Sequence, residues 1–248
     1  MSKQYYVSDI VPDYHGDQLA VWHKSVDFLQ DPRFISAYDR GMASGHHIGR
    51  NAGLPGNDLH IEWRVHVLTW AAEHALKLPG DFVECGVNTG IYSLAICEFL
   101  DFNRTGRSFY LFDTFNGLPL EQISPEELAL GRVAENEEHY SECYEIAKRN
   151  FAPFPSAKLI RGKVPDTLGS VDIPRVCYLS IDMNIAAPEI AALEYFWDRL
   201  SPGAPVVLDD YGWSVFKPQK EAMDRFAAEK EVAILNLPTG QGLILKPS

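Results

Sequence analysis

Positive charge is scarce in this 248-residue sequence, where 22 Lys and Arg stand against 34 Asp and Glu for a formal net charge of -12. Nucleic acids and anionic membrane surfaces are bound through clustered Lys and Arg. We therefore expect neither nucleic acid nor a membrane as a partner. The first residues are too polar for a signal peptide, and no apolar run approaches the length of a membrane span. These two absences predict a cytoplasmic protein.

Paired cysteines are also missing, because none of the 4 cysteines forms a CxxC motif and no Cys/His cluster indicates zinc. Cys85 and Cys177 lie within apolar runs, which indicates buried free thiols in a reducing compartment. Internal repeats and low-complexity segments are absent as well. With 46% hydrophobic residues, the chain is long enough for one large α/β domain, and nothing in it requires two.

Apolar runs of strand length alternate with helical patterns along the chain. Residues 1–60 are predicted to form an N-terminal helical cap, with a helix at 17–29 and a glycine-rich loop at 41–59. Residues 61–248 are predicted to form the main domain. Its helices are expected at 60–78, 91–101, 124–150, 187–200 and 218–229, and its strands at 82–87, 108–113, 157–160, 176–181, 205–208, 232–237 and 242–245. The alternation predicts an α/β fold with a mainly parallel seven-stranded sheet whose C-terminal strand is antiparallel.

A glycine turn at 86–90 follows the first strand of this domain and precedes a helix. This order lets backbone N–H groups and a helix N-terminus face a ligand. Asp113 ends the next strand, at about the distance along the chain at which an acid bonds a ribose hydroxyl. The turn lacks the G-x-G-x-x-G pattern that holds a pyrophosphate. A ligand with a ribose and an amino acid part but no phosphates fits better, and S-adenosylmethionine (SAM) is such a ligand.

Three further acids, Asp182, Asp209 and Asp210, end two strands that we expect to be neighbours. Carboxylates so close would raise each other's pKa unless a cation neutralised them. An all-oxygen set suits Mg²⁺, with Ca²⁺ or Mn²⁺ as alternatives. The competing interpretation is structural: one Asp caps the following helix and another pairs with a lysine such as Lys217.

Five segments resemble, in the same order, those of the macrocin-type O-methyltransferases: DFVECGVNTG, LFDTFNGLP, RGKVPDTL, LSIDMNIAAPE and SPGAPVVLDDYGW. The similarity spans about residues 80–246. It implies a Rossmann-like class I methyltransferase fold and a SAM- and Mg²⁺-dependent methyl transfer to a small-molecule hydroxyl acceptor, typically a deoxysugar of a natural product. The cofactor-binding residues that it implies are Glu84, Gly86, Asn88, Thr89, Gly90, Ser93, Asp113 and Thr114, and the metal ligands are Asp182, Asp209 and Asp210. Relatives of this kind commonly form homodimers, and no residue pattern here decides for or against one.

One position departs from the family pattern. Where the family usually has D-x-D, with the second acid resembling a general base, this chain reads Asp182-Met183-Asn184. An amide cannot accept a proton at working pH. The aromatic residue that usually follows is here Ala186. We therefore assign catalytic positions to Asp182, Asn184 and His47, and the candidates for the base are His46, His47, Asp210 and Tyr211.

Other functions remain open from the sequence. A catechol-like phenol is a more acidic acceptor and would need less help from a base, which suits Asn184. A protein that binds SAM or a metal but has lost catalysis is a second alternative. An NAD-dependent oxidoreductase is disfavoured by the missing pyrophosphate pattern.

Overall fold

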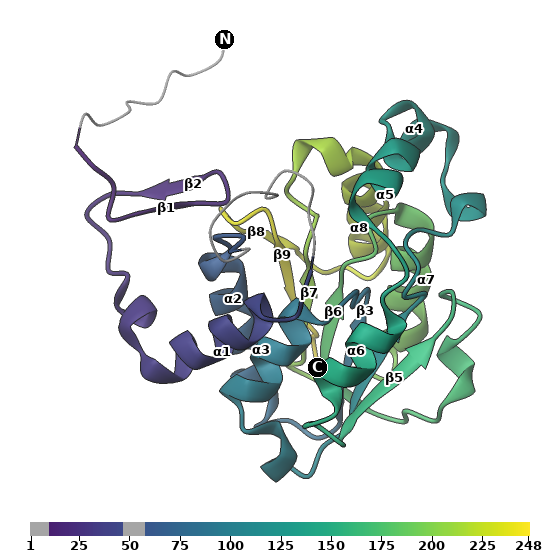
Figure 1. Ribbon diagram of the computed structural model, residues 1–248. Helices are drawn as coiled ribbons and strands as arrows, with labels where there is room; N and C mark the ends of the chain where they lie inside the picture. Colours follow the sequence, from purple (N-terminus) through teal and green to yellow (C-terminus); the bar gives the residue numbers. More distant parts are fainter. Residues whose placement is uncertain (1–9, 47–57) are drawn as a thin grey trace.

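A computed structural model describes residues 10–46 and 58–248 of the protein. Its centre is a seven-stranded sheet with the order β5-β4-β3-β6-β7-β9-β8 (Figure 1). The strands are β3 (Asp81–Cys85), β4 (Phe109–Asp113), β5 (Ala157–Arg161), β6 (Val176–Ile181), β7 (Pro205–Leu208), β8 (Leu235–Asn236) and β9 (Gly242–Leu245). Strands β3 to β7 pair in parallel, whereas β9 is antiparallel to both β7 and β8. The predicted mainly parallel sheet with an antiparallel C-terminal edge is confirmed.

Helices cover both faces of this sheet. One face packs against α2 (Glu62–Ala75), α3 (Ile91–Phe99) and α6 (Tyr144–Phe151), and the other against α7 (Ala186–Trp197) and α8 (Lys217–Glu229). Successive residues of a strand point to opposite faces. Accordingly, Phe82 of β3 belongs to the first core and Val83 to the second. Burial on both faces explains why the central strands are continuous apolar runs.

The cap contains a β-hairpin as well as a helix. Strands β1 (Tyr14–Gly16) and β2 (Leu19–Val21) pair antiparallel, so Asp17 and Gln18 form a two-residue turn. The predicted helix at 17–29 is therefore wrong. Both turn residues have a positive φ, of 48° and 59°, which ends any right-handed helix at its first residue. A short 3-10 helix, η1 (Asp27–Gln30), occupies the end of that range.

The helix of the cap is α1 (Pro32–Met42), which no pattern in the sequence analysis had identified. Asp31 caps it by accepting a hydrogen bond from the Arg33 N–H at 2.8 Å, and Pro32 follows directly. The helix packs on α3 so closely that a Cβ on Gly41 would lie 2.6 Å from the carbonyl oxygen of Ile91. Its buried side chains join the core of the first sheet face. The division at residue 60 stays a prediction.

The predicted acidic helix at 124–150 is three shorter helices, α4 (Pro125–Ala129), α5 (Arg132–His139) and α6. The first break falls at Gly131, whose φ of 86° is left-handed. The remaining 3-10 segments are η4 (Phe102–Arg104), η5 (Leu120–Gln122), η6 (Leu168–Ser170) and η7 (Ser214–Phe216). All four cysteines are buried and free, as predicted. No helix in the described part of the chain combines the length and apolar character that a membrane crossing needs.

Candidate active site

The carboxyl ends of β3, β4, β6 and β7 face one cavity of about 760 Å³. The glycine turn after β3 and the ends of the next strands line its floor. The hairpin tip of the cap, at residues 15–18, and the η7 segment line other parts of its wall. The carboxyl ends of parallel strands are where ligands bind in open α/β sheets. Predicted site residues from several strand ends therefore line one cavity in the described part of the chain.

Gly86 lets the ends of β3 and β6 meet. Its φ is 91°, and a Cβ at this position would lie 1.8 Å from the carbonyl oxygen of Asp182. Only glycine fits both the left-handed backbone and this close approach. The turn is held further by Asp113, whose Oδ2 accepts hydrogen bonds from the N–H groups of Val87 at 2.6 Å and Asn88 at 2.8 Å. Asp113 thus shapes the cofactor turn itself, a role that the sequence did not indicate.

Five of the eight predicted cofactor residues line the cavity: Glu84, Gly86, Asn88, Asp113 and Thr114. The other three, Thr89, Gly90 and Ser93, lie behind this wall. Thr89 donates to the Ser44 hydroxyl at 2.9 Å and thereby ties the turn to the cap. Their contribution to cofactor binding stays a prediction and would be indirect.

Glu84 is a buried acid with an unused acceptor. Its side chain is 1% exposed, and its Oε2 has no hydrogen-bond partner among the described residues. Burial raises the pKa of Glu84 to about 8, and the neighbouring Ser93 hydroxyl opposes that shift. A buried carboxylate without a partner is costly. The position therefore suits a ligand that brings a donor or a positive charge.

The three predicted metal ligands come together. Asp182, Asp209 and Asp210 each offer an oxygen, and these oxygens lie within 4.8 Å of one another. Asp210 is 6% exposed and its Oδ2 has no hydrogen-bond partner among the described residues. Burial raises the pKa of Asp182 and of Asp210 well above the ordinary range, and the charge of Asp209 adds to both shifts. Both pKa values are raised first by burial and then by the neighbouring negative charge.

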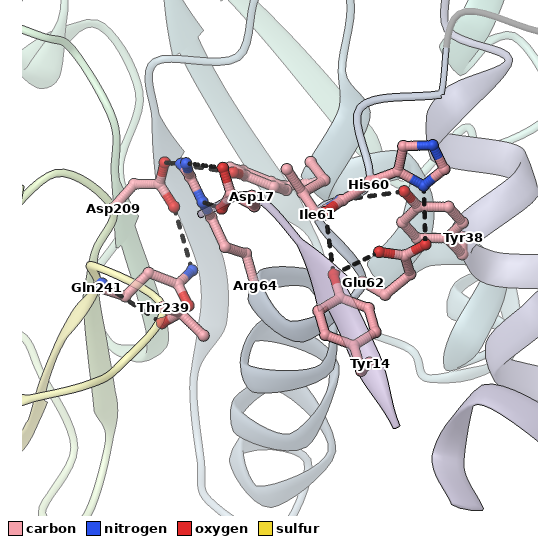
Figure 2. A network of polar contacts seen from close by, with 11 residues as sticks. Tyr14, Asp17, Tyr38, His60, Ile61, Glu62, Arg64, Asp209, Thr239 and Gln241 are labelled. Carbon is pink, nitrogen blue, oxygen red and sulfur yellow. Dashed lines mark hydrogen bonds and ion pairs between the residues drawn. The ribbon is translucent and has the colours of Figure 1, made fainter. Parts of the chain in front are cut away.

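Arg64 is the cation that the sequence analysis missed. It stands in the first turn of α2, and its guanidinium lies between Asp209 and Asp17 (Figure 2). Nη1 donates to Asp209 Oδ2 at 2.8 Å, while Nε and Nη2 donate to the two oxygens of Asp17 at 2.6 and 3.0 Å. Lys217, the alternative partner considered from the sequence, pairs with Glu221 at 3.1 Å instead.

Asp209 is surrounded by donors. Besides Arg64, the Tyr92 hydroxyl donates to Oδ2 at 3.2 Å and Gln241 Nε2 donates to Oδ1 at 3.1 Å. Both of its oxygens are therefore bonded, in contrast to Asp210. The three acids differ in how readily a metal could reach them.

Asn184 lies beside the acid cluster. It lines the cavity, and its Nδ2 is 3.4 Å from Asp182 Oδ1. Its φ is 62°, a left-handed conformation that Asn adopts more readily than most residues. The loop that carries it is held by two buried glutamates. Glu189 accepts from the Met183 N–H at 3.1 Å, and Glu127 accepts from the Ala186 N–H at 2.7 Å.

The candidates for a proton acceptor fall into three groups. His46 and Asp210 line the cavity, and so do His15, His60 and His139, which the sequence analysis did not select. Tyr211 does not line the cavity. Its hydroxyl donates to Asp224 at 2.6 Å and accepts from Lys220 at 3.1 Å. His47 lies outside the described residues.

Comparison with known proteins identifies one enzyme family and its fold. The family model described as macrocin-O-methyltransferase (TylF) matches residues 62–235. A relative from Streptomyces olivaceus, named 8-demethyl-8-(2,3-dimethoxy-alpha-L-rhamnosyl)-tetracenomycin-C 4'-O-methyltransferase, is 29% identical over 158 residues, covering 60% of this chain and 60% of the relative. Mycinamicin III 3''-O-methyltransferase from Micromonospora griseorubida is 26% identical over 163 residues, covering 60% of this chain and 62% of its own. The chain thus spans about three fifths of the length of these relatives.

Solved structures show the same fold. The O-methyltransferase NovP superposes with a TM-score of 0.63 at 22% identity, covering 75% of this chain and 80% of its own. The calicheamicin methyltransferase CalS11 gives a TM-score of 0.56 at 16% identity and covers 90% and 94% of the two chains. These likenesses confirm the predicted Rossmann-like class I arrangement.

Proposed function

The chain belongs to the macrocin-O-methyltransferase family, and we propose that it transfers the methyl group of SAM to a hydroxyl of a sugar moiety in a natural product. The names of the two curated relatives support this acceptor class, since one names a rhamnosyl derivative of tetracenomycin C and the other mycinamicin III. The observation that carries the proposal is the single cavity onto which both the glycine turn and the acid cluster open.

The residues present fit SAM. The Glu84 carboxylate lines the cavity and its Oε2 has no hydrogen-bond partner among the described residues, so it suits the ammonium of the methionine part, which would return the acid to its charged form. Asp113 accepts from three backbone N–H groups, and the Thr114 hydroxyl lies 3.4 Å from its Oδ1. That hydroxyl lies closer to the Gly117 carbonyl, at 2.6 Å, so we propose that the fourth acceptor site of Asp113 takes a ribose hydroxyl. The backbone N–H groups of Val87 and Asn88 already point at Asp113, so the turn offers no cradle for a pyrophosphate.

The acid cluster fits a divalent cation. We propose that Asp182, Asp209 and Asp210 hold Mg²⁺, with Ca²⁺ or Mn²⁺ as alternatives, because the donors are all carboxylate oxygens and Asp210 Oδ2 is buried without a partner. When bound, such an ion would lower the pKa of the acceptor hydroxyl and orient it. The residues of the chain itself must position the acceptor. The cavity must hold the acceptor oxygen in line with the methyl group and exclude water from it.

The proton of the acceptor hydroxyl needs a destination other than Asn184. Its amide has no basic lone pair at working pH, and here it faces Asp182 as a donor. Asp210 lines the cavity and is one candidate among the described residues, through the oxygen that would not hold the metal. His46 lines the same cavity and is the second candidate. The assignment of His47 stays a prediction.

One observation favours a second acceptor class. Asn184 stands where the family pattern has an acid, and a catechol-like phenol ionises more readily than a sugar hydroxyl. Incubation of the protein with isotope-labelled SAM and Mg²⁺, with a glycosylated polyketide or a catechol as acceptor, separates the two. Label on the sugar oxygen supports the proposal. Label on the catechol alone would replace it, and SAM binding without turnover on either acceptor would indicate lost catalysis.

A further inference from the structure

Arg64 is a largely buried arginine that bridges two acids, Asp209 of the acid cluster and Asp17 of the hairpin. Its side chain is 13% exposed, and the two acids that it bridges, Asp209 and Asp17, are 5% and 17% exposed. The guanidinium also lies 4.9 Å from the centre of the Trp213 ring. An arginine held by a bidentate carboxylate and an aromatic ring is fixed in direction as well as in place. Its Nη1 is therefore aimed at Asp209 Oδ2.

Asp17 reaches Arg64 from an unusual backbone position. It forms the tip of the β1–β2 hairpin together with Gln18, and both residues are left-handed. Asp is common at the first position of such two-residue turns, but Gln replaces the usual Gly at the second position, which costs conformational energy. The neighbouring Gly16 lets the tip approach, since a Cβ there would lie 2.7 Å from the carbonyl oxygen of His60. The hairpin thus places the Asp17 carboxylate against Arg64 at the wall of the cavity.

We propose that Arg64 competes with a divalent cation for Asp209, and that Asp17 is the partner that retains Arg64 when the cation takes Asp209. The inference rests on the proposed metal site. Asp209 Oδ2 already accepts from Arg64 and from the Tyr92 hydroxyl, so a metal ion at this oxygen would have to displace one of them, and its charge would repel the guanidinium. Asp209 Oδ1 already accepts from Gln241, so it has less acceptor capacity left for the ion than an unbonded oxygen. Arg64 therefore lowers the affinity of the acid cluster for a cation. Asp17 weakens this effect, because it offers Arg64 a second ionic partner.

The two variants that test the proposal shift affinity in opposite directions. In Arg64→Met, Asp209 loses its positive neighbour, so the dissociation constant for Mg²⁺ should fall about tenfold or more. Asp209 keeps its bonds to Tyr92 and Gln241, which favours a folded variant. In Asp17→Asn, Arg64 loses its second ionic partner and stays on Asp209. The dissociation constant should then rise by about threefold to tenfold.

Two exposed ion pairs supply matched controls. Arg33→Met removes the same charge as Arg64→Met from a pair with Glu73 in which both side chains are about half exposed. Asp101→Asn matches Asp17→Asn closely, because Asp101 also has a φ of 48° and pairs with an arginine, Arg104, at 3.5 Å. Both controls should bind Mg²⁺ as the unmodified protein does, because neither contacts the cavity.

The measurement is isothermal titration of the full chain with Mg²⁺ in the absence of SAM, repeated with Mn²⁺ by counting free ion in electron paramagnetic resonance. Tighter binding by Arg64→Met together with weaker binding by Asp17→Asn supports the proposal. Equal or weaker binding by both variants overturns it and leaves Arg64 a structural residue. If neither the unmodified protein nor Arg64→Met binds either ion, the metal site itself is refuted. Should Arg64→Met not fold, Arg64→Lys decides, since an ammonium cannot hold both acids in the same fork and should give tighter binding.

Discussion

Asn184 presents an amide to Asp182, with its Nδ2 3.4 Å from Asp182 Oδ1. In the family pattern an acid stands at this position, so the two side chains would there carry like charges. The amide donates to Asp182 where an acid could only accept. This pair bears directly on the chemistry of the site, because a hydrogen-bond donor lines the cavity where the family pattern has an acid.

We expect Asn184→Asp to raise the rate of methyl transfer to a sugar hydroxyl. A positioned general base contributes about 100-fold or more to such a reaction, so a gain of about tenfold is expected even in imperfect geometry. Asp tolerates the left-handed backbone nearly as well as Asn. The rate constant is measured with saturating SAM over a range of pH. An unchanged rate would mean that another residue of the cavity already serves as the base.

Glu84→Gln should weaken SAM binding without altering the fold. The amide is almost isosteric, but it cannot supply the negative charge that we propose for the ammonium of SAM. An increase in the dissociation constant of about tenfold is expected in calorimetry, as for the loss of a buried charge-assisted hydrogen bond. Glu229→Gln, on the exposed end of α8, is the control with the same charge change. Equal affinity of both variants would remove Glu84 from the cofactor site.

The stability of the free protein should fall as the pH rises, and Glu189 should contribute to the fall. Burial raises the pKa of Glu189 from its ordinary value of 4.5 to about 8. The folded state therefore keeps a proton that the unfolded chain has released, and its contribution is lost as pH rises from the lower value through the higher. Between pH 4.5 and about pH 8, the free energy of unfolding measured in urea should fall less in Glu189→Gln than in the unmodified protein. A loss equal to that of the unmodified protein contradicts the assignment.

Glu127 should prove to be the residue that connects the acidic helix α4 to the loop that carries Asn184. Its Oε2 accepts from the backbone N–H and the hydroxyl of Ser124 at 2.8 and 2.7 Å, while Oε1 accepts from the Ala186 N–H. Glu127→Ala should lower the free energy of unfolding by about 1–3 kcal/mol, because it breaks the capping box with Ser124 and leaves the partly buried Ala186 N–H unpaired. Glu126→Ala, one residue earlier and exposed, should be nearly neutral in the same urea titration. Similar losses in both would show that the contact to Ala186 is unimportant.

The sequence predicted the parts of the molecule whose signal is local. The strands at 176–181 and 205–208 were predicted with the bounds that the structure gives, because every residue of β6 and β7 is buried and the runs are uninterrupted. The acid cluster followed from the same logic, since parallel strands end at one edge of the sheet. The hairpin at the N-terminus was missed because Gln18 stands where such turns usually have Gly.

Arg64 could not have been found from its surroundings in the sequence. Its two partners, Asp17 and Asp209, lie 47 and 145 residues away. Only the folded chain brings the start of α2 to the cavity wall. The structural role of Asp113 was hidden for a similar reason, because its hydrogen bonds to the glycine turn span 25 and 26 residues. The sequence could predict neither the long-range ion pairs of Arg64 nor whether Asp113 binds a ligand or supports the glycine turn.

The most direct test of the proposed activity follows an isotope-labelled methyl group from SAM to the acceptor. The unmodified protein and Asp210→Asn are each incubated with labelled SAM and a glycosylated polyketide, with Mg²⁺ or with a chelator, and the products are analysed by mass spectrometry and NMR. We predict label on one sugar oxygen with the unmodified protein and Mg²⁺, and a loss of about 100-fold or more in rate with the chelator or with Asp210→Asn. Equal labelling in all four reactions, or no transfer to the sugar while SAM binds, would contradict the account.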